Sequence, residues 1–298
     1  MTTKRIIVLG TMRSGTSLIA ELIRRWGAYS GSENDLWKSD INDPRGYGYM
    51  EYIPLQNLND ELLDNNDRIP PSHKLLEEKA SDPIFREKAS GLLQEMDEET
   101  MKNKFDAWVW KDARLPLTLP FWMKFWDDPV YVITVRHPAE VILSSAKTED
   151  LDEENIPFSA GLAYWQYCML NILSSTQESR HKFFISYEQL INNPLRECTR
   201  LCQFLDEQSG KPAEEAQHRI KAMLPQVAEN QRHHHYPKAL AEMEQATREQ
   251  RALYNFLRVK IMDPDEAYQQ DDFALYPGWK EYLQTMDMLL TLSRSQDT

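Results

Sequence analysis

Short apolar runs alternate along the chain with longer segments whose apolar residues recur every three or four positions. The runs cover residues 6–9, 108–110, 130–135 and 183–186, and their β-branched and aromatic side chains are typical of strands buried on both faces of a parallel sheet. Patterns typical of helices follow at residues 17–26, 117–125, 139–147, 159–179 and 195–205. This order predicts βαβ units with right-handed crossovers, and a binding site at the carboxyl ends of the strands.

Two segments lie outside this alternation. Residues 31–103 form an insertion between the first and second predicted strands, and residues 212–298 form a mostly polar, helical C-terminal region. Tyr47, Tyr49 and Tyr52 lie in the first half of the insertion, for which two interpretations stay open: a lid over a bound substrate, or a helical excursion on the surface. The chain has no internal repeat and no low-complexity linker, so we expect one domain over residues 1–298.

A loop with glycines at both ends follows the first predicted strand and leads directly into the first helix. A strand that turns through such a loop into a helix directs backbone N–H groups and the positive end of the helix dipole at one point, which suits a phosphate. Gly10 and Gly15 have the spacing of the common phosphate loop G-x-x-x-x-G-K-[ST], but Thr16 occupies the position of its Lys. The missing Lys argues against ordinary nucleoside triphosphate chemistry, and Arg13 supplies a cation inside the loop instead.

A second candidate phosphate site follows the third predicted strand. Arg136 stands at the end of that strand, and Ser144 follows eight residues later on the next predicted helix. Both residue types bind phosphate oxygens, and both are placed at the carboxyl side of the predicted sheet. Two phosphate sites without a nucleotide-hydrolysis signature indicate a ligand with two separated phosphates.

These residues resemble the sulfotransferases that use 3′-phosphoadenosine 5′-phosphosulfate (PAPS), of the bacterial or cytosolic type. Residues 11–18 fit the family's loop for the 5′-phosphosulfate, and Arg136-His137-Pro138 with Ser144 fits its segment for the 3′-phosphate. Residues 183–190 are similar to the family's F-x-x-Y-E-x-L segment, whose tyrosine, here Tyr187, lies beside the adenine. Residues 110–116 are similar to the K-D-P-R segment of bacterial members. The resemblance covers about the first two thirds of the chain.

The resemblance implies a P-loop-like α/β fold, in which a doubly wound parallel sheet is flanked by helices, with the helical insertion after the first βα unit and the helical C-terminal region as additions. It implies in-line, metal-independent transfer of the sulfuryl group of PAPS to a hydroxyl or amine of a small-molecule or carbohydrate acceptor, with 3′,5′-adenosine bisphosphate (PAP) as the product. The cofactor-binding residues it implies are Thr11, Met12, Arg13, Ser14, Gly15, Thr16, Ser17, Arg136, Ser144 and Tyr187. Two alternatives stay open: a P-loop kinase or other phosphotransferase, and a catalytically inactive nucleotide-binding protein.

Positioning and charge stabilisation dominate this kind of chemistry, so the candidate catalytic residues are mainly cations. The resemblance gives Arg13 the role of stabilising the leaving group, and Lys111 is the candidate that holds the transferring sulfonate. Cytosolic members carry a catalytic histidine two residues after the corresponding lysine, and that position here is Ala113. The usual base is therefore missing.

Three residues are candidates for the general base. Glu51 ends a segment similar to the N-P-x-G-Y-x-E segment of bacterial relatives, Asp112 is adjacent to Lys111, and His73 lies farther along the insertion. A carboxylate in a partly dry site, with a raised pKa, accepts a hydroxyl proton near neutral pH. We favour Glu51, because Asp112 has an alternative role in orienting Lys111 or Arg114 through an ion pair.

Net charge and the length of apolar runs limit the classes of partner that we expect. The chain has 298 residues and a net charge of −13, which argues against a nucleic-acid substrate, although a local group of cations can still bind an anionic nucleotide. No apolar run reaches the length needed to span a membrane and no leader is recognisable, so we expect no membrane partner and a cytoplasmic location. The three cysteines form no metal or disulfide pattern.

Two C-terminal features lie outside these motifs. We interpret the run His233-His234-His235 as a solvated loop, because adjacent histidines point in different directions and no Glu or Cys lies at ligand spacing. Residues 276–280 form an aromatic turn that either caps the site or packs against the fold. The late Arg-Lys-Gly motif of some cytosolic members is absent, so the closing contact on the 3′-phosphate stays open.

Overall fold

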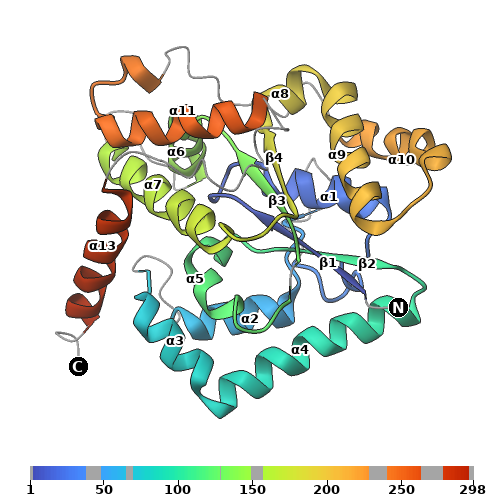
Figure 1. The fold of residues 1–298 in the computed structure, drawn as a ribbon, viewed down its shortest axis with the longest axis horizontal. Helices are drawn as coiled ribbons and strands as arrows, with labels where there is room; N and C mark the ends of the chain where they lie inside the picture. The colour runs from blue at the N-terminus through green and yellow to red at the C-terminus, as the bar shows by residue number, and fades with distance from the viewer. Residues whose placement is uncertain are drawn as a thin grey trace.

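A parallel sheet forms the centre of the computed structural model, which describes residues 3–37, 48–64, 70–127, 129–148, 157–227, 240–262 and 278–294. Its strands lie in the order β2-β1-β3-β4 (Figure 1). The strands are β1 (Lys4–Leu9), β2 (Ala107–Lys111), β3 (Val130–Val135) and β4 (Lys182–Ser186). All three strand pairs are parallel, so the predicted parallel α/β sheet is confirmed.

Helices cover both faces of the sheet, because successive side chains of each strand point to opposite faces and both sets are apolar. On β1, Ile6 and Val8 enter one core and Ile7 and Leu9 enter the other. The first core packs against α1 (Thr16–Trp26), α9 (Pro194–Ser209) and α10 (Ala216–Met223). The second packs against α5 (Leu115–Trp122), α7 (Phe158–Ser175), α11 (Arg248–Met262) and α13 (Trp279–Arg294). The sheet is therefore doubly wound.

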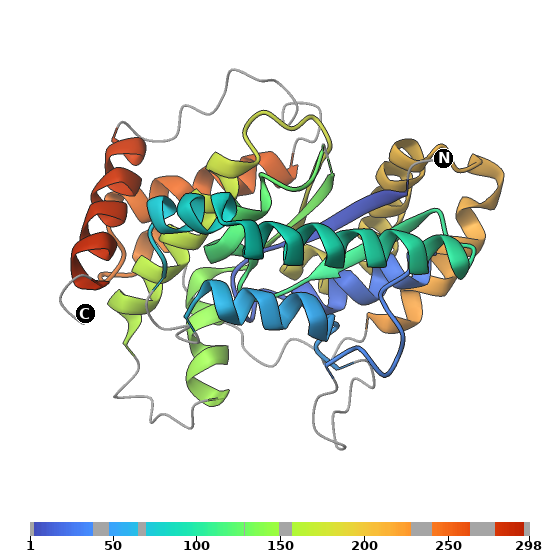
Figure 2. The same cartoon turned by 90° about the horizontal axis from the view of Figure 1, so that it is seen from below.

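Helices also make up most of what the structure describes of the insertion. They are α2 (Ile53–Leu62), α3 (His73–Ser81) and α4 (Pro83–Lys102). Helices α2 and α4 run side by side along the β2 side of the molecule (Figures 1 and 2), and α2 and α3 both contact α5. The insertion thus becomes part of the second core, since Leu55, Leu58 and Leu76 are fully or almost fully buried there.

Three predicted helices differ from the observed ones by more than one residue at an end. The helix predicted at residues 117–125 spans Leu115–Trp122, and it begins earlier because Pro116 is tolerated in the first turn, where its missing N–H has no helical partner to lose. The helix predicted at residues 159–179 ends at Ser175, and the one predicted at residues 195–205 continues to Ser209. Helices α6 (Pro138–Thr148) and α8 (Tyr187–Asn192) follow β3 and β4 directly.

The register of the sheet brings the carboxyl ends of the strands to one edge. Val8 of β1 lies opposite Lys111 of β2, and Val135 of β3 lies opposite Ser186 of β4. The segments that leave these strands therefore start close together, which is where ligands bind in open parallel sheets.

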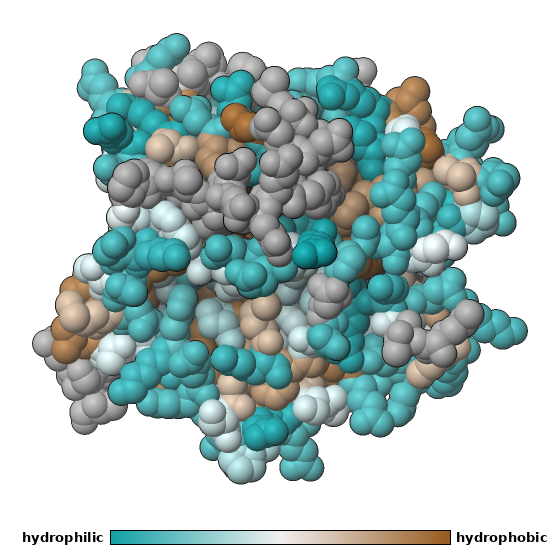
Figure 3. Space-filling view, in the orientation of Figure 1, coloured by the Kyte–Doolittle hydropathy of each residue, from teal (hydrophilic) through white to brown (hydrophobic). Residues whose placement is uncertain are grey.

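The surface in the view of Figure 3 is mostly hydrophilic, with apolar side chains showing over α13 at the left. Met288, Leu289 and Leu292 of this helix are exposed. Among the described residues, the structure contains no helix with the length and apolar character that crossing a membrane requires.

Candidate functional site

The loop between β1 and α1 is a tight turn with two residues in left-handed conformations. Arg13 has φ 67° and Gly15, the residue before α1, has φ 96°. Ser14 closes the turn, because its backbone N–H and its hydroxyl both donate to the carbonyl of Thr11, at 3.1 and 2.6 Å. No acidic residue lies in the first turn of α1. The N–H groups at this helix end therefore present a positive potential that fits an anion.

Tyr187, the first residue of α8, lies on this loop. A methyl group at Gly15 would overlap the Tyr187 ring, so the ring packs directly against the glycine backbone. The ring also contacts Arg136, whose guanidinium carbon lies 4.5 Å from the ring centroid. Tyr187 thus joins the loop after β1 to the residue that follows β3.

Arg136 is buried at the end of β3 and bonds to the loop itself. Its Nη1 donates to the carbonyl of Arg13 at 3.0 Å, and its Nε donates to Glu140 at 3.2 Å. The first bond stabilises the left-handed conformation at Arg13, which a non-glycine residue adopts at a cost. The side chain of Arg13 in turn donates from Nε to the hydroxyl of Ser144 at 3.0 Å. The two predicted phosphate motifs are therefore in direct contact and form one site.

A buried ion pair stands at the end of β2. Lys111 Nζ lies 2.6 Å from Glu51 Oε1, and the side chains are 4% and 9% exposed. The same carboxylate oxygen accepts from the backbone N–H of Ala113 at 3.2 Å, and Arg114 Nη1 lies 3.7 Å from the other oxygen. A buried charge needs such partners, because each ion loses its hydration. Glu51 is therefore held by Lys111, the last residue of β2, and by Ala113 and Arg114 in the segment that follows.

The segment that carries Glu51 also touches the phosphate loop's helix. The hydroxyl of Ser17, in the first turn of α1, donates to the carbonyl of Tyr49 at 3.1 Å. Lys111 lies beside Val8, two residues before the loop begins at Gly10. These two contacts place the Lys111–Glu51 pair next to the loop, on the β2 side.

Asp112 points away from this pair and into the insertion. Its Oδ2 accepts from Asn59 Nδ2 at 2.8 Å, and its Oδ1 accepts from the backbone N–H and from Nη1 of Arg114, at 2.8 and 3.3 Å. Burial, and next the charge of Glu51, raise the pKa of Asp112 to about 6, although Arg114 and its hydrogen bonds act in the opposite direction. Asp112 therefore contacts Arg114, and the alternative role of orienting this arginine stays a prediction.

A profile of the sulfotransferase family matches residues 5–211, which is more than half of the chain and includes every residue of the site described above. The chain belongs to the sulfotransferase family. The predicted family membership is confirmed, and the doubly wound parallel sheet agrees with the fold that it implied. No curated protein matches this sulfotransferase.

Solved structures similar to this sulfotransferase are themselves sulfotransferases. The sulfotransferase domain of the olefin synthase from Synechococcus PCC 7002 is 19% identical over 99% of this chain and 95% of its own, with a TM-score of 0.44. The sulfotransferase domain from the curacin biosynthetic pathway is 17% identical over 98% of both chains, with a TM-score of 0.42. A sulfotransferase from Mycobacterium avium is 16% identical over 96% of this chain and 77% of its own, with a TM-score of 0.44.

Most of the residues that the sequence singled out in this sulfotransferase lie in two adjacent groups. One group surrounds the phosphate loop and consists of residues 11–17 with Arg136, Ser144 and Tyr187. The other consists of Glu51, Lys111 and Asp112 at the end of β2. Within the loop, Ser14 and Thr16 are buried and Met12 is 43% exposed.

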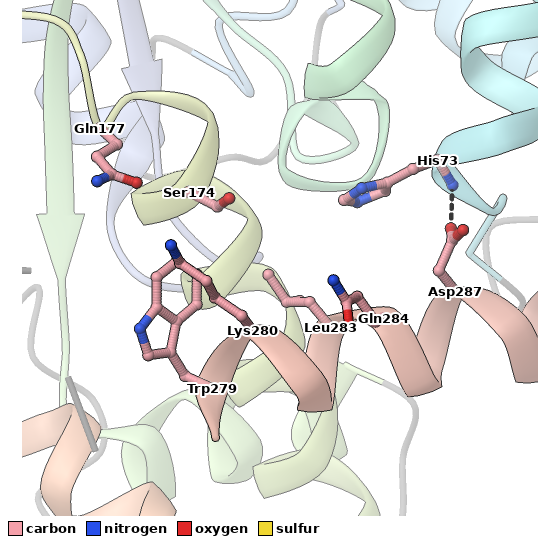
Figure 4. Close-up of a pocket in the computed structure, with 8 residues that line it drawn as sticks. All are labelled: His73, Ser174, Gln177, Trp279, Lys280, Leu283, Gln284 and Asp287. Atoms are coloured by element: carbon pink, nitrogen blue, oxygen red, sulfur yellow. Dashed lines mark hydrogen bonds between the residues drawn. The ribbon is translucent and has the colours of Figure 1, made fainter. Parts of the chain in front are cut away.

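His73 lies in another part of the molecule. It lines a cavity of about 350 Å³ between α3, α7 and α13, together with Gln177, Trp279 and Lys280 (Figure 4). Its ring contacts Asn171, at 3.1 Å, and its backbone N–H donates to Asp287. Helix α7 returns from the carboxyl edge of the sheet to the start of β4, so its last turn and this cavity lie at the amino edge. His73 therefore lies apart from the loop after β1 and from the Lys111–Glu51 pair.

The aromatic turn is described only in part. Trp279 and Lys280 begin α13 and line the cavity at the amino edge, so these two residues do not cap the phosphate loop. Tyr276 and Pro277 lie outside the described residues, as do the run 233–235 and residues 42–47 ahead of Glu51. The described part of the chain contains no group of three or more His, Cys, Asp or Glu residues arranged for a metal ion.

Sequence reasoning missed two residues that shape the site. Asn59 of α2 is completely buried and bonds to Asp112, and Glu188 of α8 accepts from the backbone N–H of His137 at 2.6 Å. Glu188 lies in the motif of residues 183–190, but the sequence indicated a role only for its neighbour Tyr187. Asn59 belongs to no motif. The one feature that could have indicated it is an amide at an otherwise apolar position of an amphipathic helix.

Proposed function

We propose that this sulfotransferase transfers the sulfuryl group of PAPS to a hydroxyl or amine of a small-molecule or carbohydrate acceptor, in line and without a metal ion. The observation that carries the proposal is the contact between the two phosphate motifs, in which Arg13 bonds to Ser144 and Arg136 bonds to the carbonyl of Arg13. One loop and two arginines at one point suit a nucleotide that carries phosphates on both sides of its ribose.

The residues present fit such a donor. The amides of residues 14–17 and the side chain of Arg13 would hold the 5′-phosphosulfate, and Arg136 with Ser144 would hold the 3′-phosphate. Tyr187 offers an aromatic face at the edge of the same loop for the adenine. The cations of this group offset the acidity of the chain as a whole, whose net charge is −13.

PAPS supplies a sulfuryl group that is already activated, so the protein needs to place reactants and stabilise charge. The acceptor oxygen or nitrogen forms its bond to sulfur as the bond from sulfur to the bridging phosphate oxygen breaks, and the electron pair stays on that phosphate oxygen. Arg13 neutralises the charge that develops there. Lys111 neutralises charge on the transferring group, and Glu51 accepts the proton of the acceptor.

The ion pair between Lys111 and Glu51 has a role in this scheme. The Glu51 carboxylate accepts hydrogen bonds from Lys111 Nζ and from the backbone N–H of Ala113, so the proposed base lies against the residue that would hold the transferring group. Negative charge bound beside Lys111 competes with Glu51 for that lysine.

The proposal includes a cytoplasmic location and no nucleic-acid or membrane partner. The cysteines support a reducing compartment, because Cys168, Cys198 and Cys202 are all free and buried. Burial raises the pKa of each of these thiols, which makes them unreactive packing residues.

Calorimetric titration with PAP and, separately, with Mg-ATP tests the donor. We expect micromolar binding of PAP and little binding of ATP, because the lysine that grips the β- and γ-phosphates of ATP is replaced by Thr16. Preference for Mg-ATP would support a P-loop phosphotransferase instead. Binding of PAP without turnover of radiolabelled PAPS, across a panel of phenols, amines and sugars, would support an inactive nucleotide-binding protein.

Two arginine variants separate binding from catalysis. Arg13→Ala should lower kcat about 100- to 1000-fold with a modest loss of PAP affinity, because its charge acts mainly on the leaving group. Arg136→Ala should weaken PAP binding and leave the binding of 5′-AMP nearly unchanged. Normal binding and turnover in both variants would contradict the assignment of the loop.

A further inference from the structure

The amide of Asn59 makes three hydrogen bonds in the interior of the protein. Its Oδ1 accepts from the hydroxyl of Thr118 at 2.9 Å and from the indole N–H of Trp122 at 2.8 Å, and its Nδ2 donates to Asp112 at 2.8 Å. An indole nitrogen only donates, so the amide oxygen must face Trp122 and the amide nitrogen must face Asp112. The orientation of this amide is therefore fixed.

Asp112 transmits this orientation to a turn. The carboxylate oxygen that Asn59 does not use accepts from the backbone N–H and the guanidinium of Arg114. The turn formed by residues 112–114 then offers two donors to Glu51: the N–H of Ala113, at 3.2 Å, and Nη1 of Arg114, at 3.7 Å. A continuous series of contacts leads from Asn59 to the Lys111–Glu51 pair.

We propose that Asn59 is a positioning residue of the transfer reaction: its amide holds Asp112 so that residues 112–114 keep the Glu51 carboxylate in place against Lys111. The proposal rests on the proposed function, in which Glu51 is the base and Lys111 holds the transferring group. The hydrogen bonds of Asn59 go to Thr118, Trp122 and Asp112, and it acts through Asp112.

Competition for Arg114 explains why the amide is needed. The guanidinium lies near three carboxylates, since Asp60 is 2.5 Å from its Nε and Asp112 and Glu51 are both near its Nη1. A buried carboxylate oxygen without a donor carries a large desolvation cost. Without Asn59, the freed oxygen of Asp112 turns to Arg114 and draws it away from Glu51. The Asn59 amide donates to this oxygen of Asp112, so Arg114 can contact Asp112 and Glu51 at the same time.

Asn59→Asp is the sharpest test, because it replaces the donor nitrogen of the amide by an acceptor oxygen and changes little else. The new carboxylate still accepts from Thr118 and Trp122, but an acceptor now faces Asp112 where a donor stood. At low pH the two carboxyls share a proton, which replaces the lost bond, and at high pH they repel each other. We expect kcat to fall about 10- to 100-fold at pH 8 and to recover as the pH is lowered to 6, with the KM for PAPS nearly unchanged.

Two further variants control the test. Asn57→Asp makes the same change at an exposed position of the same helix and should leave kcat and its pH profile as in the wild type. The double variant Asn59→Asp/Asp112→Asn reverses donor and acceptor and restores the bond, so it should recover kcat at pH 8 relative to Asn59→Asp. Thermal melting of each variant is recorded alongside.

The outcomes separate the inference from the proposed function. No turnover of PAPS by the wild type, with any acceptor in the panel, overturns both. Wild-type turnover with an unchanged pH profile in Asn59→Asp overturns the inference alone, as does a double variant that regains its melting temperature without regaining kcat. If Asn59→Asp fails to fold, Asp112→Asn breaks the same hydrogen bond from the other side, because the amide that replaces Asp112 cannot accept from both Asn59 and Arg114. An unchanged kcat in that variant also overturns the inference.

Discussion

Arg13 donates a 3.0 Å hydrogen bond from Nε to the hydroxyl of Ser144, across the gap between the loop after β1 and the helix after β3. The bond joins a candidate catalytic residue to a candidate binding residue for the 3′-phosphate. The Ser144 hydroxyl therefore lies between the residues proposed for the 5′-phosphosulfate and those proposed for the 3′-phosphate. Removing this hydroxyl should affect nucleotide binding and the orientation of Arg13, and the two effects can be measured separately.

Ser144→Ala should weaken PAP binding about fivefold, the equivalent of about 1 kcal/mol for one hydrogen bond, and leave the affinity for 5′-AMP unchanged because that nucleotide has no 3′-phosphate. Calorimetric titration of both nucleotides gives the comparison. Ser145→Ala, which removes the neighbouring hydroxyl, serves as the control. Equal losses for PAP and AMP would show that Ser144 acts only through the shape of the loop.

Gly15→Ala should destabilise the protein by about 1–3 kcal/mol and abolish PAP binding, because the new methyl group meets Tyr187 and because φ 96° is unfavourable for alanine. Urea unfolding and calorimetry measure the two effects. The matched control is Gly91→Ala in α4, where a methyl group meets no atom within 4 Å and a gain of about 0.5–1 kcal/mol is expected. A Gly15→Ala protein of wild-type stability would refute the close packing of Tyr187.

Lys111→Met should lower the free energy of unfolding by about 3–5 kcal/mol, because it leaves the buried carboxylate of Glu51 without its main partner. Neutralising both residues, as Lys111→Met/Glu51→Gln, should recover much of this loss but none of the turnover. Lys102→Met, which breaks an exposed pair with Glu99, should leave the unfolding midpoint unchanged. Equal effects of the buried and exposed changes would argue against a desolvated pair.

Asp112 should make stability depend on pH between about 4 and 6. Its pKa is about 6 in the folded protein, above the ordinary value of 3.8, so the folded state binds this proton more tightly than the unfolded chain. The stabilisation by the proton is complete below about pH 4 and is lost as the pH rises through 6, a change of about 3 kcal/mol at 1.4 kcal/mol per pKa unit. Wild type should therefore lose stability relative to Asp112→Asn over this range.

Urea unfolding at several pH values checks this expectation. The measured quantity is the difference in unfolding free energy between wild type and Asp112→Asn, so that the titration of other carboxyls cancels. Glu87→Gln, at an exposed position of α4, is the control and should give a constant difference. A constant difference for Asp112→Asn as well would show that Asp112 stays ionised throughout, held by Arg114 and Asn59.

The sequence made the sheet and the tight turn between β1 and α1 predictable because their signals are local. Strand β3 is an unbroken apolar run, since both of its faces are buried, and the loop at Gly15 needs a glycine for its left-handed backbone. The meeting of Arg136 and Arg13 followed from topology, because both leave parallel strands at the same edge.

The contacts of the insertion were not predictable in the same way. Asn59 and Asp112 lie 53 positions apart, and their bond exists only because α2 packs against α5. The pairing of Glu51 with Lys111 arises from the same packing. Side-chain partners of this kind depend on how two helices meet, which no local pattern specifies. The position of His73 likewise depends on the path of α7, which no local pattern specifies.

The ion pair between Glu51 and Lys111 also limits how this protein can be recombined with its relatives. One member of the pair belongs to the insertion and the other to the central sheet, and neither tolerates burial alone. An insertion transplanted from another sulfotransferase to change the acceptor would separate them. Chimeras should therefore exchange residues 48–64 and 107–122 together, since these two segments share one set of charges and amides.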